Sequence, residues 1–191
     1  SQIESSDHTN QTIGSKLVDF TLKYPESGNL PQYLTAQLLA GLFRTSEIEV
    51  VGGDESVFGI NTTSKKPADI WLEVEGVPTN LYEVTVKPVS LKRLDDSLDA
   101  LHTTGHLDYP VTFICRIDLD VQELSLENGS FQYKGKRFDF IDYKFFCLSV
   151  FALLNEEECS TVLANVAKFV QDKNISMRTK SGWNEFFENE I

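Results

Sequence analysis

The sequence predicts an α/β (α+β) protein in which helices flank a mixed central β-sheet. Three features of the chain favour this class. Two segments with apolar residues at helical spacing come first, and two short segments that alternate polar and apolar residues follow them. The second alternating segment is followed by a helix and another strand, an order that favours parallel pairing of the two strands. The sheet is therefore expected to contain both antiparallel and parallel neighbours.

Length and composition fit one folded domain. Residues 1–10 are polar and lack periodicity, which predicts a disordered lead-in, and residues 11–191 are expected to form a single domain. No apolar run reaches the roughly 18 residues of a membrane span, so no membrane partner is expected. Three cysteines without CxxC spacing predict reduced core thiols in a cytoplasmic protein, not a disulfide framework.

Two helices are predicted ahead of the sheet. Segment 12–24 carries apolar residues at helical spacing and stops at Pro25, and segment 31–43 repeats leucine in the same way. Both helices are expected to face the core. A short strand is predicted at 48–51 and a further one at 57–60.

The functional interpretation depends on segment 69–87. Its two halves alternate, so each predicts a half-buried strand, and the residues between them favour a turn. One face of this hairpin is apolar, with Ile70, Leu72, Val74, Tyr82, Val84 and Val86. The other face carries Asp69, Glu73, Glu75, Glu83, Thr85 and Lys87, together with Trp71 and Leu81.

Antiparallel counting predicts which polar side chains meet. A three-residue loop at 76–78 would place Asp69 opposite Thr85. Glu83 and Lys87 would then be diagonal neighbours of Asp69, about 7–8 Å away. The register therefore predicts a cluster of Asp69, Glu83 and Lys87.

The chain after the hairpin predicts a helix and a buried strand. Ser90 is a plausible N-cap for a helix over 91–103, which Gly105 ends. The β-branched, apolar segment 111–117 predicts a strand.

A second hairpin is predicted next, with strands at 121–126 and 131–138 joined at Asn128-Gly129. Three helices are then expected to cover the sheet, beginning near Phe140, at Asn155 and at Ser181.

Segment 67–69 (Pro-Ala-Asp), the hairpin and Glu83-x-Thr85-x-Lys87 together resemble the motif of the PD-(D/E)xK nuclease superfamily. In that family an Asp on one strand and an acid-x-Lys pair on the next bind Mg²⁺ and activate water against a DNA phosphodiester. An alanine separates Pro67 from Asp69 here, and the second half reads Glu-x-Thr or Thr-x-Lys. Helix, hairpin, helix and strand is also the element order of the family's restriction-endonuclease-like core.

The resemblance implies a Mg²⁺-dependent DNA endonuclease of the restriction type, or the nuclease domain of a larger defence or recombination protein. Asp69 and Glu83 would bind Mg²⁺, for which Mn²⁺ could substitute, and Lys87 would supply the catalytic cation. Thr85 and Asp99 are accessory candidates. A competing assignment takes Thr85-x-Lys87 as the motif and recruits Asp99 from the following helix as the second metal ligand.

The net charge of −12 opposes DNA binding, because non-specific affinity comes from Lys and Arg neutralising phosphates. Segment 64–93 nevertheless holds five of the eight basic residues in the first hundred positions. The expected contacts to the backbone of double-stranded DNA are Ser64, Lys65, Lys66, Lys92 and Arg93. Weak binding by the chain alone is expected, so a homodimer or a larger chain or complex would be needed.

A second function stays open. The acidic composition and the departures from the motif also fit a non-catalytic binding or assembly domain that retains a nuclease-like fold. Motifs of other chemistries, such as GxSxG, GxGxxG and the P-loop, are absent from the sequence.

Overall fold

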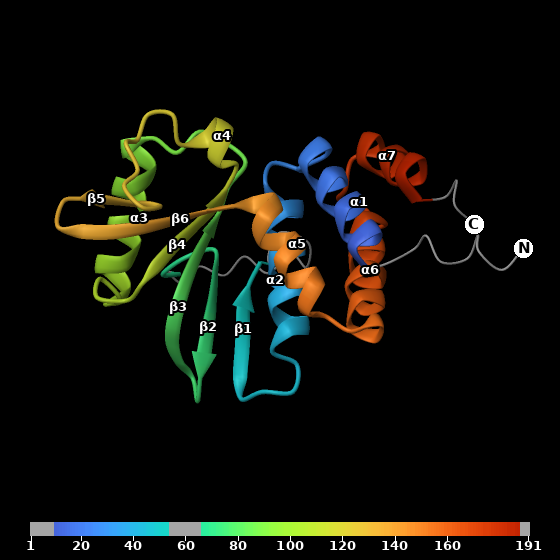
Figure 1. The fold of residues 1–191 in the computed structure, drawn as a ribbon, viewed down its shortest axis with the longest axis horizontal. Coiled ribbons are helices and arrows are strands. Elements are labelled where there is room, and N and C mark those ends of the chain that lie inside the picture. The colour runs from blue at the N-terminus through green and yellow to red at the C-terminus, as the bar shows by residue number, and fades with distance from the viewer. Residues whose placement is uncertain (1–9, 54–65, 188–191) are drawn as a thin grey trace, which may run out of the picture.

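The computed structural model describes residues 10–53 and 66–187, which Figure 1 shows as a coloured ribbon. The elements in these ranges are α1 (Asn10–Lys23), α2 (Asn29–Leu42), β1 (Ile48–Gly52), β2 (Ile70–Val74), β3 (Val77–Val84), α3 (Leu91–Thr104), β4 (Val111–Cys115), α4 (Ile117–Asp120), β5 (Ser130–Tyr133), β6 (Lys136–Asp142), α5 (Tyr143–Leu153), α6 (Glu156–Val170) and α7 (Met177–Phe187). The predicted strand 57–60, and the predicted lead-in apart from its last residue, lie outside these ranges.

The strands form one mixed sheet with the order β1-β2-β3-β4-β6-β5. Strands β1, β2 and β3 are antiparallel neighbours, β4 is parallel to both β3 and β6, and β5 is antiparallel to β6. The predicted class, a mixed sheet flanked by helices, is confirmed. Parallel pairing of the two strands on either side of α3 is confirmed as well.

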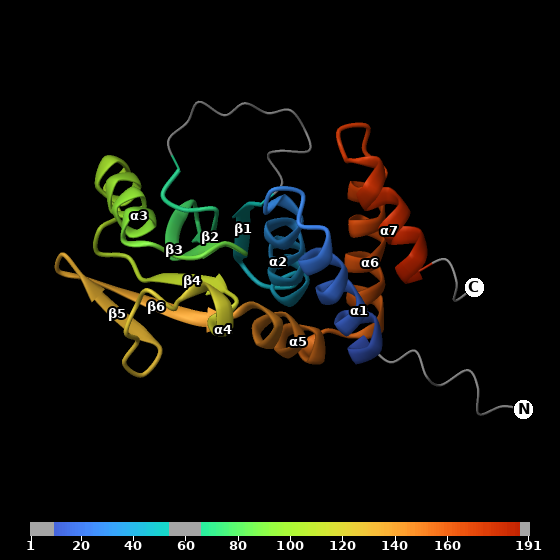
Figure 2. The same ribbon diagram turned by 90° about the horizontal axis from the view of Figure 1, so that it is seen from above.

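The two faces of the sheet belong to two hydrophobic cores, because successive residues of a strand point to opposite faces. Ile114 of β4 packs with residues of α1, α2, α5, α6 and α7. Phe113 and Cys115 of the same strand pack with Leu94 and Leu101 of α3. Figure 2 shows α3 apart from the group that the other five long helices form. The face under α3 is the one that carries the polar residues of the hairpin.

Two further predictions can be compared with the structure. Cys115, Cys147 and Cys159 are free and buried, which confirms unpaired core thiols. No helix in the described ranges has the length and apolarity needed to cross a membrane.

The β2–β3 hairpin has a tighter turn than the sequence predicts. Val74 pairs with Val77, so Glu75 and Gly76 form a two-residue turn with φ values of 52° and 77°. Positive φ at both positions is typical of a type I′ turn, whose twist matches that of the strands. The predicted three-residue loop is therefore wrong. Opposite the step from Leu72 to Glu73, β3 contains an extra residue, Thr79, and this bulge brings the register one residue closer to the predicted one.

This register gives Asp69 a different partner. Ile70 pairs with Tyr82, so Asp69, one residue earlier, lies level with Glu83, one residue later. The expected partner was Thr85. This net shift of two residues leaves Asp69 and Glu83 on the same face, as predicted, because the side-chain period of a strand is two.

The second hairpin turns at Lys134-Gly135, between β5 and β6, and not at Asn128-Gly129. The Asn-Gly turn exists, but it closes only an isolated bridge between the residues on either side of it. Val121 and Leu124 are buried in the core under α3. Segment 121–126 therefore packs into this core and does not form the predicted strand.

The last three helices differ from the prediction mainly in where they begin. Helix α5 starts after Asp142, whose Oδ2 accepts a hydrogen bond of 3.1 Å from the backbone N–H of Phe145. The predicted capping signal of Asn155 and Glu158 is confirmed as a complete capping box at the start of α6. Helix α7 begins at Met177, a turn earlier than predicted.

Candidate active site

Two carboxyl groups meet on the sheet face that α3 covers. Asp69 directly precedes β2, and Glu83 lies opposite it near the end of β3. Glu83 is only 3% exposed, whereas the Asp69 side chain is 24% exposed. Oδ2 of Asp69 accepts a hydrogen bond of 3.0 Å from the backbone N–H of Val84. Asp69 and Glu83 are called the acid pair below.

Arg93 contacts both members of the acid pair. Its Nη2 lies 2.8 Å from Oε2 of Glu83 and 3.6 Å from Oδ2 of Asp69. The guanidinium also lies over the Phe113 ring, 5.5 Å from the ring centroid. Ser90 caps α3 by accepting a hydrogen bond of 3.2 Å from the backbone N–H of Arg93. The start of α3 thus places a cation against two carboxyl groups from neighbouring strands.

The electrostatics of this site follow from burial and charge. Burial raises the pKa of Glu83 well above its usual range, the charge of Asp69 raises it further, and Arg93 opposes both effects. Burial alone would lower the pKa of Arg93, but the charges of Glu83 and Asp69 raise it. Arg93 therefore stays charged, while the raised pKa of Glu83 means that this carboxyl takes up a proton more readily than an isolated one.

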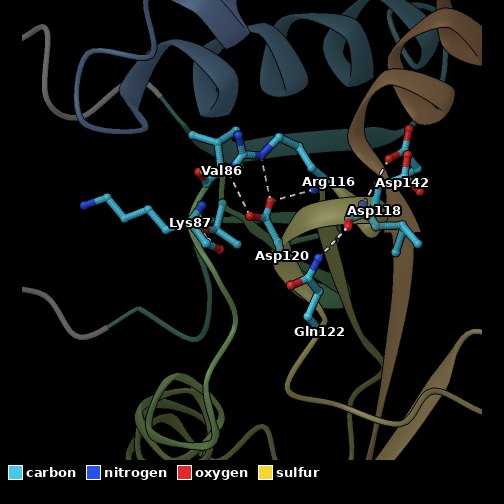
Figure 3. Close-up of polar contacts among 9 residues, drawn as sticks. Val86, Lys87, Arg116, Asp118, Asp120, Gln122 and Asp142 are labelled. Atoms are coloured by element: carbon cyan, nitrogen blue, oxygen red, sulfur yellow. Dashed lines mark hydrogen bonds and ion pairs between the residues drawn. The ribbon is translucent and has the colours of Figure 1, made fainter.

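Lys87 does not contact the acid pair. Strand β3 ends at Val84, and the backbone N–H of Thr85 makes one more bond to the neighbouring strand, to the carbonyl of Ile114 at 3.0 Å. The backbone N–H of Lys87 then donates to the Thr85 hydroxyl over 3.1 Å as the chain leaves the sheet. The Lys87 side chain is exposed, and Figure 3 shows it extending away from Arg116 and Asp120. Within the described residues, Arg93 is the cation on the acid pair.

An ion pair between half-buried Arg116 and buried Asp120 fixes the segment between β3 and α3 (Figure 3). Asp120 is 1% exposed and accepts hydrogen bonds from Nε and Nη2 of Arg116 at 3.0 Å and 2.8 Å. Nη2 of Arg116 also donates to the carbonyl of Val86 over 2.7 Å. The carbonyl of Asp120 accepts a bond of 2.6 Å from the backbone N–H of Val89. The Arg116–Asp120 pair thereby holds the residues that lead into α3 and, through α3, the position of Arg93.

Cys115, next to this ion pair, is not a candidate nucleophile. Burial, together with the charges of Asp120 and Asp142, raises the pKa of its thiol to about 12. The thiolate is the reactive form of cysteine, so Cys115 is unreactive at neutral pH.

The remaining predicted residues are Asp99 and the expected DNA contacts other than Arg93. Asp99 is exposed on α3, six residues beyond Arg93 and therefore about 240° around the helix. Lys92 is exposed and pairs with Asp96 at 3.3 Å. Lys66 is half-buried, and the predicted DNA contacts Ser64 and Lys65 fall outside the described residues.

Sequence reasoning missed two features of the site. Arg93 was expected to contact DNA, and its ten-residue separation from Glu83 gives no sign that α3 brings the two together. The Arg116–Asp120 pair has a weak signal in the sequence. A basic and an acidic residue four positions apart can pair on one helix face, but their burial depends on the fold.

The chain matches no protein-family model and no curated protein. Whether the site suits a metal ion therefore depends on the ligand atoms that its own side chains supply. In the described ranges no group of three or more His, Cys, Asp or Glu side chains is suited to hold a metal ion. The acid pair supplies two carboxylates, and Mg²⁺ usually takes one or two carboxylates with water and phosphate oxygens as its other ligands. The acid pair meets that requirement.

Proposed function

We propose that the chain is a Mg²⁺-dependent DNA endonuclease with a restriction-endonuclease-like core. The observation that supports this most strongly is the position of Asp69 opposite Glu83. The motif of the PD-(D/E)xK superfamily likewise has one acidic residue on each of two neighbouring strands. The order α2, the β2–β3 hairpin, α3 and the parallel strand β4 follows the helix, hairpin, helix and strand that the resemblance implies, with β1 as an additional strand between α2 and the hairpin. The enzyme would act in the cytoplasm, as a restriction enzyme or within a larger defence or recombination protein.

Each residue of the site has a distinct role in this proposal. Asp69 and Glu83 would bind Mg²⁺ or Mn²⁺, and the ion, when bound, polarises the phosphate and lowers the pKa of a coordinated water. Arg93 takes the cationic role that the motif gives to lysine, since a guanidinium stabilises charge that develops on a phosphate. Lys87, exposed just beyond β3, would contact the DNA backbone and lie outside the reacting centre.

The substrate is double-stranded DNA, which the chain would bind as a homodimer or as part of a larger chain or complex. A net charge of −12 repels phosphates over most of the surface. A second set of basic contacts would be needed to offset this repulsion.

One observation favours the second candidate function, a non-catalytic binding or assembly domain. Arg93 already contacts both carboxyl groups, and Thr85 stands where the motif has its lysine. In this case the triad of Asp69, Glu83 and Arg93 would stabilise the contact between α3 and the sheet.

Nicking of supercoiled plasmid DNA distinguishes the two functions. The purified chain is incubated with Mg²⁺, with Mn²⁺ or with EDTA, beside Asp69→Asn and the control Glu123→Gln, which changes an exposed carboxylate. Ion-dependent nicking that Glu123→Gln retains and Asp69→Asn loses supports the endonuclease. Equal nicking by folded Asp69→Asn excludes this site as its source, and DNA binding without nicking under any condition supports the non-catalytic domain.

A further inference from the structure

The acid pair already holds a cation of the protein's own. A single nitrogen of Arg93, Nη2, is 2.8 Å from Glu83 and 3.6 Å from Asp69. It lies on the same carboxylates that would bind a divalent ion under the proposed function, on which this inference rests. A metal ion and the guanidinium therefore compete for the same oxygens.

Arg93 only partly compensates the charge of the acid pair. When both carboxyl groups are ionised, the form that binds a metal ion, they and one guanidinium leave a net charge of −1 in a site where Glu83 is 3% exposed. Buried charge is costly unless it is paired, so a divalent ion, which balances both carboxylates, would be favoured over a monovalent one. The guanidinium lies closer to Glu83 than to Asp69, so the charge of Asp69 is the less compensated of the two.

The position of Arg93 in the first turn of α3 does not help to hold its positive charge at the acid pair. It is the third residue of the helix, in a first turn that also contains Lys92 and has no acidic residue. The N-terminus of a helix carries partial positive charge and disfavours cations. The acid pair, and not the helix, therefore keeps the guanidinium in place.

The guanidinium can leave the acid pair without movement of α3. Its side chain is 31% exposed and rests on the face of the Phe113 ring. The start of the helix is held independently, by the Ser90 cap and by the bond from Val89 to Asp120. Rotation about the side-chain bonds of Arg93 is therefore sufficient to bring the guanidinium to the open side of the site.

We propose that Arg93 is a displaceable counter-ion, which neutralises the acid pair in the metal-free protein and is displaced when a divalent cation binds Asp69 and Glu83. The displaced guanidinium then binds a phosphate of the DNA beside the metal, since arginine forms paired hydrogen bonds with phosphate. Arg93 thus stabilises the acid pair when no metal ion is bound and contacts the DNA when a metal ion is bound. Metal affinity is lowered by the free energy of the contact that must be broken.

Calorimetric titration of Mn²⁺ into the full chain tests this proposal. Arg93→Met removes the charge and keeps an apolar stem over Phe113, and Lys92→Met removes the same charge from the adjacent residue, whose side chain is 83% exposed. Arg93→Met is expected to bind Mn²⁺ at least about tenfold more tightly than wild type, because binding no longer has to displace a competing contact. Lys92→Met should change the dissociation constant less than about twofold. Adding Glu83→Gln to Arg93→Met should abolish the gain.

A measurement on the wild type avoids dependence on a folded variant. In a ¹⁵N spectrum of the arginine Nε–H groups, Mg²⁺ should shift the signal of Arg93. The signal of Arg116, held by Asp120, should stay fixed. Equal Mn²⁺ affinity in wild type and Arg93→Met overturns the proposal. So does an Arg93 signal that does not move while Mg²⁺ saturates the protein.

The plasmid assay separates this inference from the proposed function. Ion-dependent nicking by a wild type whose Arg93 signal is insensitive to Mg²⁺ overturns the counter-ion role and leaves the endonuclease standing. Absence of both nicking and ion binding at the acid pair overturns the two together.

Discussion

The backbone N–H of Val84 donates a hydrogen bond of 3.0 Å to Oδ2 of Asp69. This bond ties the residue that precedes β2 to the last residue of β3. It orients the Asp69 carboxylate from the main chain, independently of Arg93. The side chain is thus positioned at the acid pair before any ligand arrives.

Asp69→Asn and Asp69→Ala should therefore differ in stability but not in activity. Asparagine can still accept the bond from Val84, whereas alanine leaves that N–H without its acceptor and should lower the free energy of unfolding by about 1–2 kcal/mol. Both substitutions remove a charge that the proposed metal requires, so both should abolish nicking. Urea denaturation and plasmid nicking check the two statements, and an active Asp69→Ala would remove this residue from the site.

The alternation of residues 70–74 and 81–86 was enough to predict which hairpin side chains share a face, because the strand period does not depend on the turn. It was not enough to predict the register. Pro78 favours a turn by its intrinsic preference, yet it lies inside β3, opposite Glu73, and the chain reverses at Glu75-Gly76 instead. Tertiary pairing outweighed the local preference.

The position of Arg93 could not be predicted for a different reason. The helix predicted over 91–103 ends one residue before the observed end of α3. Leu94, Leu98 and Leu101 lie at helical spacing and indicate which side of α3 faces the sheet. How far along β3 the helix begins depends on the loop, which Arg116 and Asp120 hold. That contact joins residues about 30 positions apart in the chain, and no local pattern encodes it.

Asp120→Ala should destabilise the fold substantially. The substitution removes the carboxylate that pairs with Arg116. It breaks the three hydrogen bonds that Arg116 donates to this carboxylate. The expected loss is about 2–3 kcal/mol in the free energy of unfolding, because the hydrogen bonds that a buried carboxylate accepts from a charged partner are lost. The control is Asp118→Ala, an exposed residue of the same short helix, which should change stability by less than about 0.5 kcal/mol. Similar urea midpoints for the two variants would contradict this role.

Glu26 should make stability depend on acid pH. Burial opposes its ionisation, but bonds from the Ser176 hydroxyl at 2.6 Å, the Thr179 hydroxyl and the backbone N–H of Ser176 lower its pKa below the ordinary 4.5. A carboxyl whose pKa is lower in the folded than in the unfolded state contributes stability above the unfolded pKa. This contribution is lost as pH falls through the folded pKa.

Glu26→Gln is accordingly expected to lose about 1 kcal/mol of unfolding free energy at pH 7. The difference from wild type should shrink as pH falls below 4.5. Urea titrations at several pH values measure this, with Glu123→Gln as an exposed control. A difference that is constant with pH would show that the charge of Glu26 is not involved.

Lys87→Ala should weaken DNA binding without abolishing cleavage. The side chain is exposed and does not contact the acid pair, so its loss removes one phosphate contact. Wild-type affinity should itself be weak, with a dissociation constant above about 1 µM at physiological salt. The variant should bind less tightly and reduce the salt slope by about 1. Fluorescence anisotropy over a range of salt concentrations checks both, with Lys173→Ala as the control. A folded Lys87→Ala that binds normally and cannot cleave would return Lys87 to the catalytic group.

Glu83, and not Asp99, should be the second metal carboxylate. Glu83 lies level with Asp69, and the guanidinium of Arg93 contacts both carboxyl groups. Asp99 is exposed and lies six residues beyond Arg93, which is about 9 Å further along the helix axis. An aspartate side chain is too short to return over that distance to the face under α3.

Glu83→Gln should therefore lower the rate of Mg²⁺-dependent nicking by at least about 100-fold, the scale expected when a charged ligand is lost from a catalytic metal. Asp99→Asn should leave the rate within about twofold of wild type, because surface substitutions away from a site have small effects. Both substitutions remove one negative charge and keep the shape of the side chain, so each is the control for the other. Circular dichroism establishes that both variants are folded. An active Glu83→Gln beside an inactive, folded Asp99→Asn would assign the second ligand to α3. It would also mean that the contact between Glu83 and Arg93 serves only to hold the helix on the sheet.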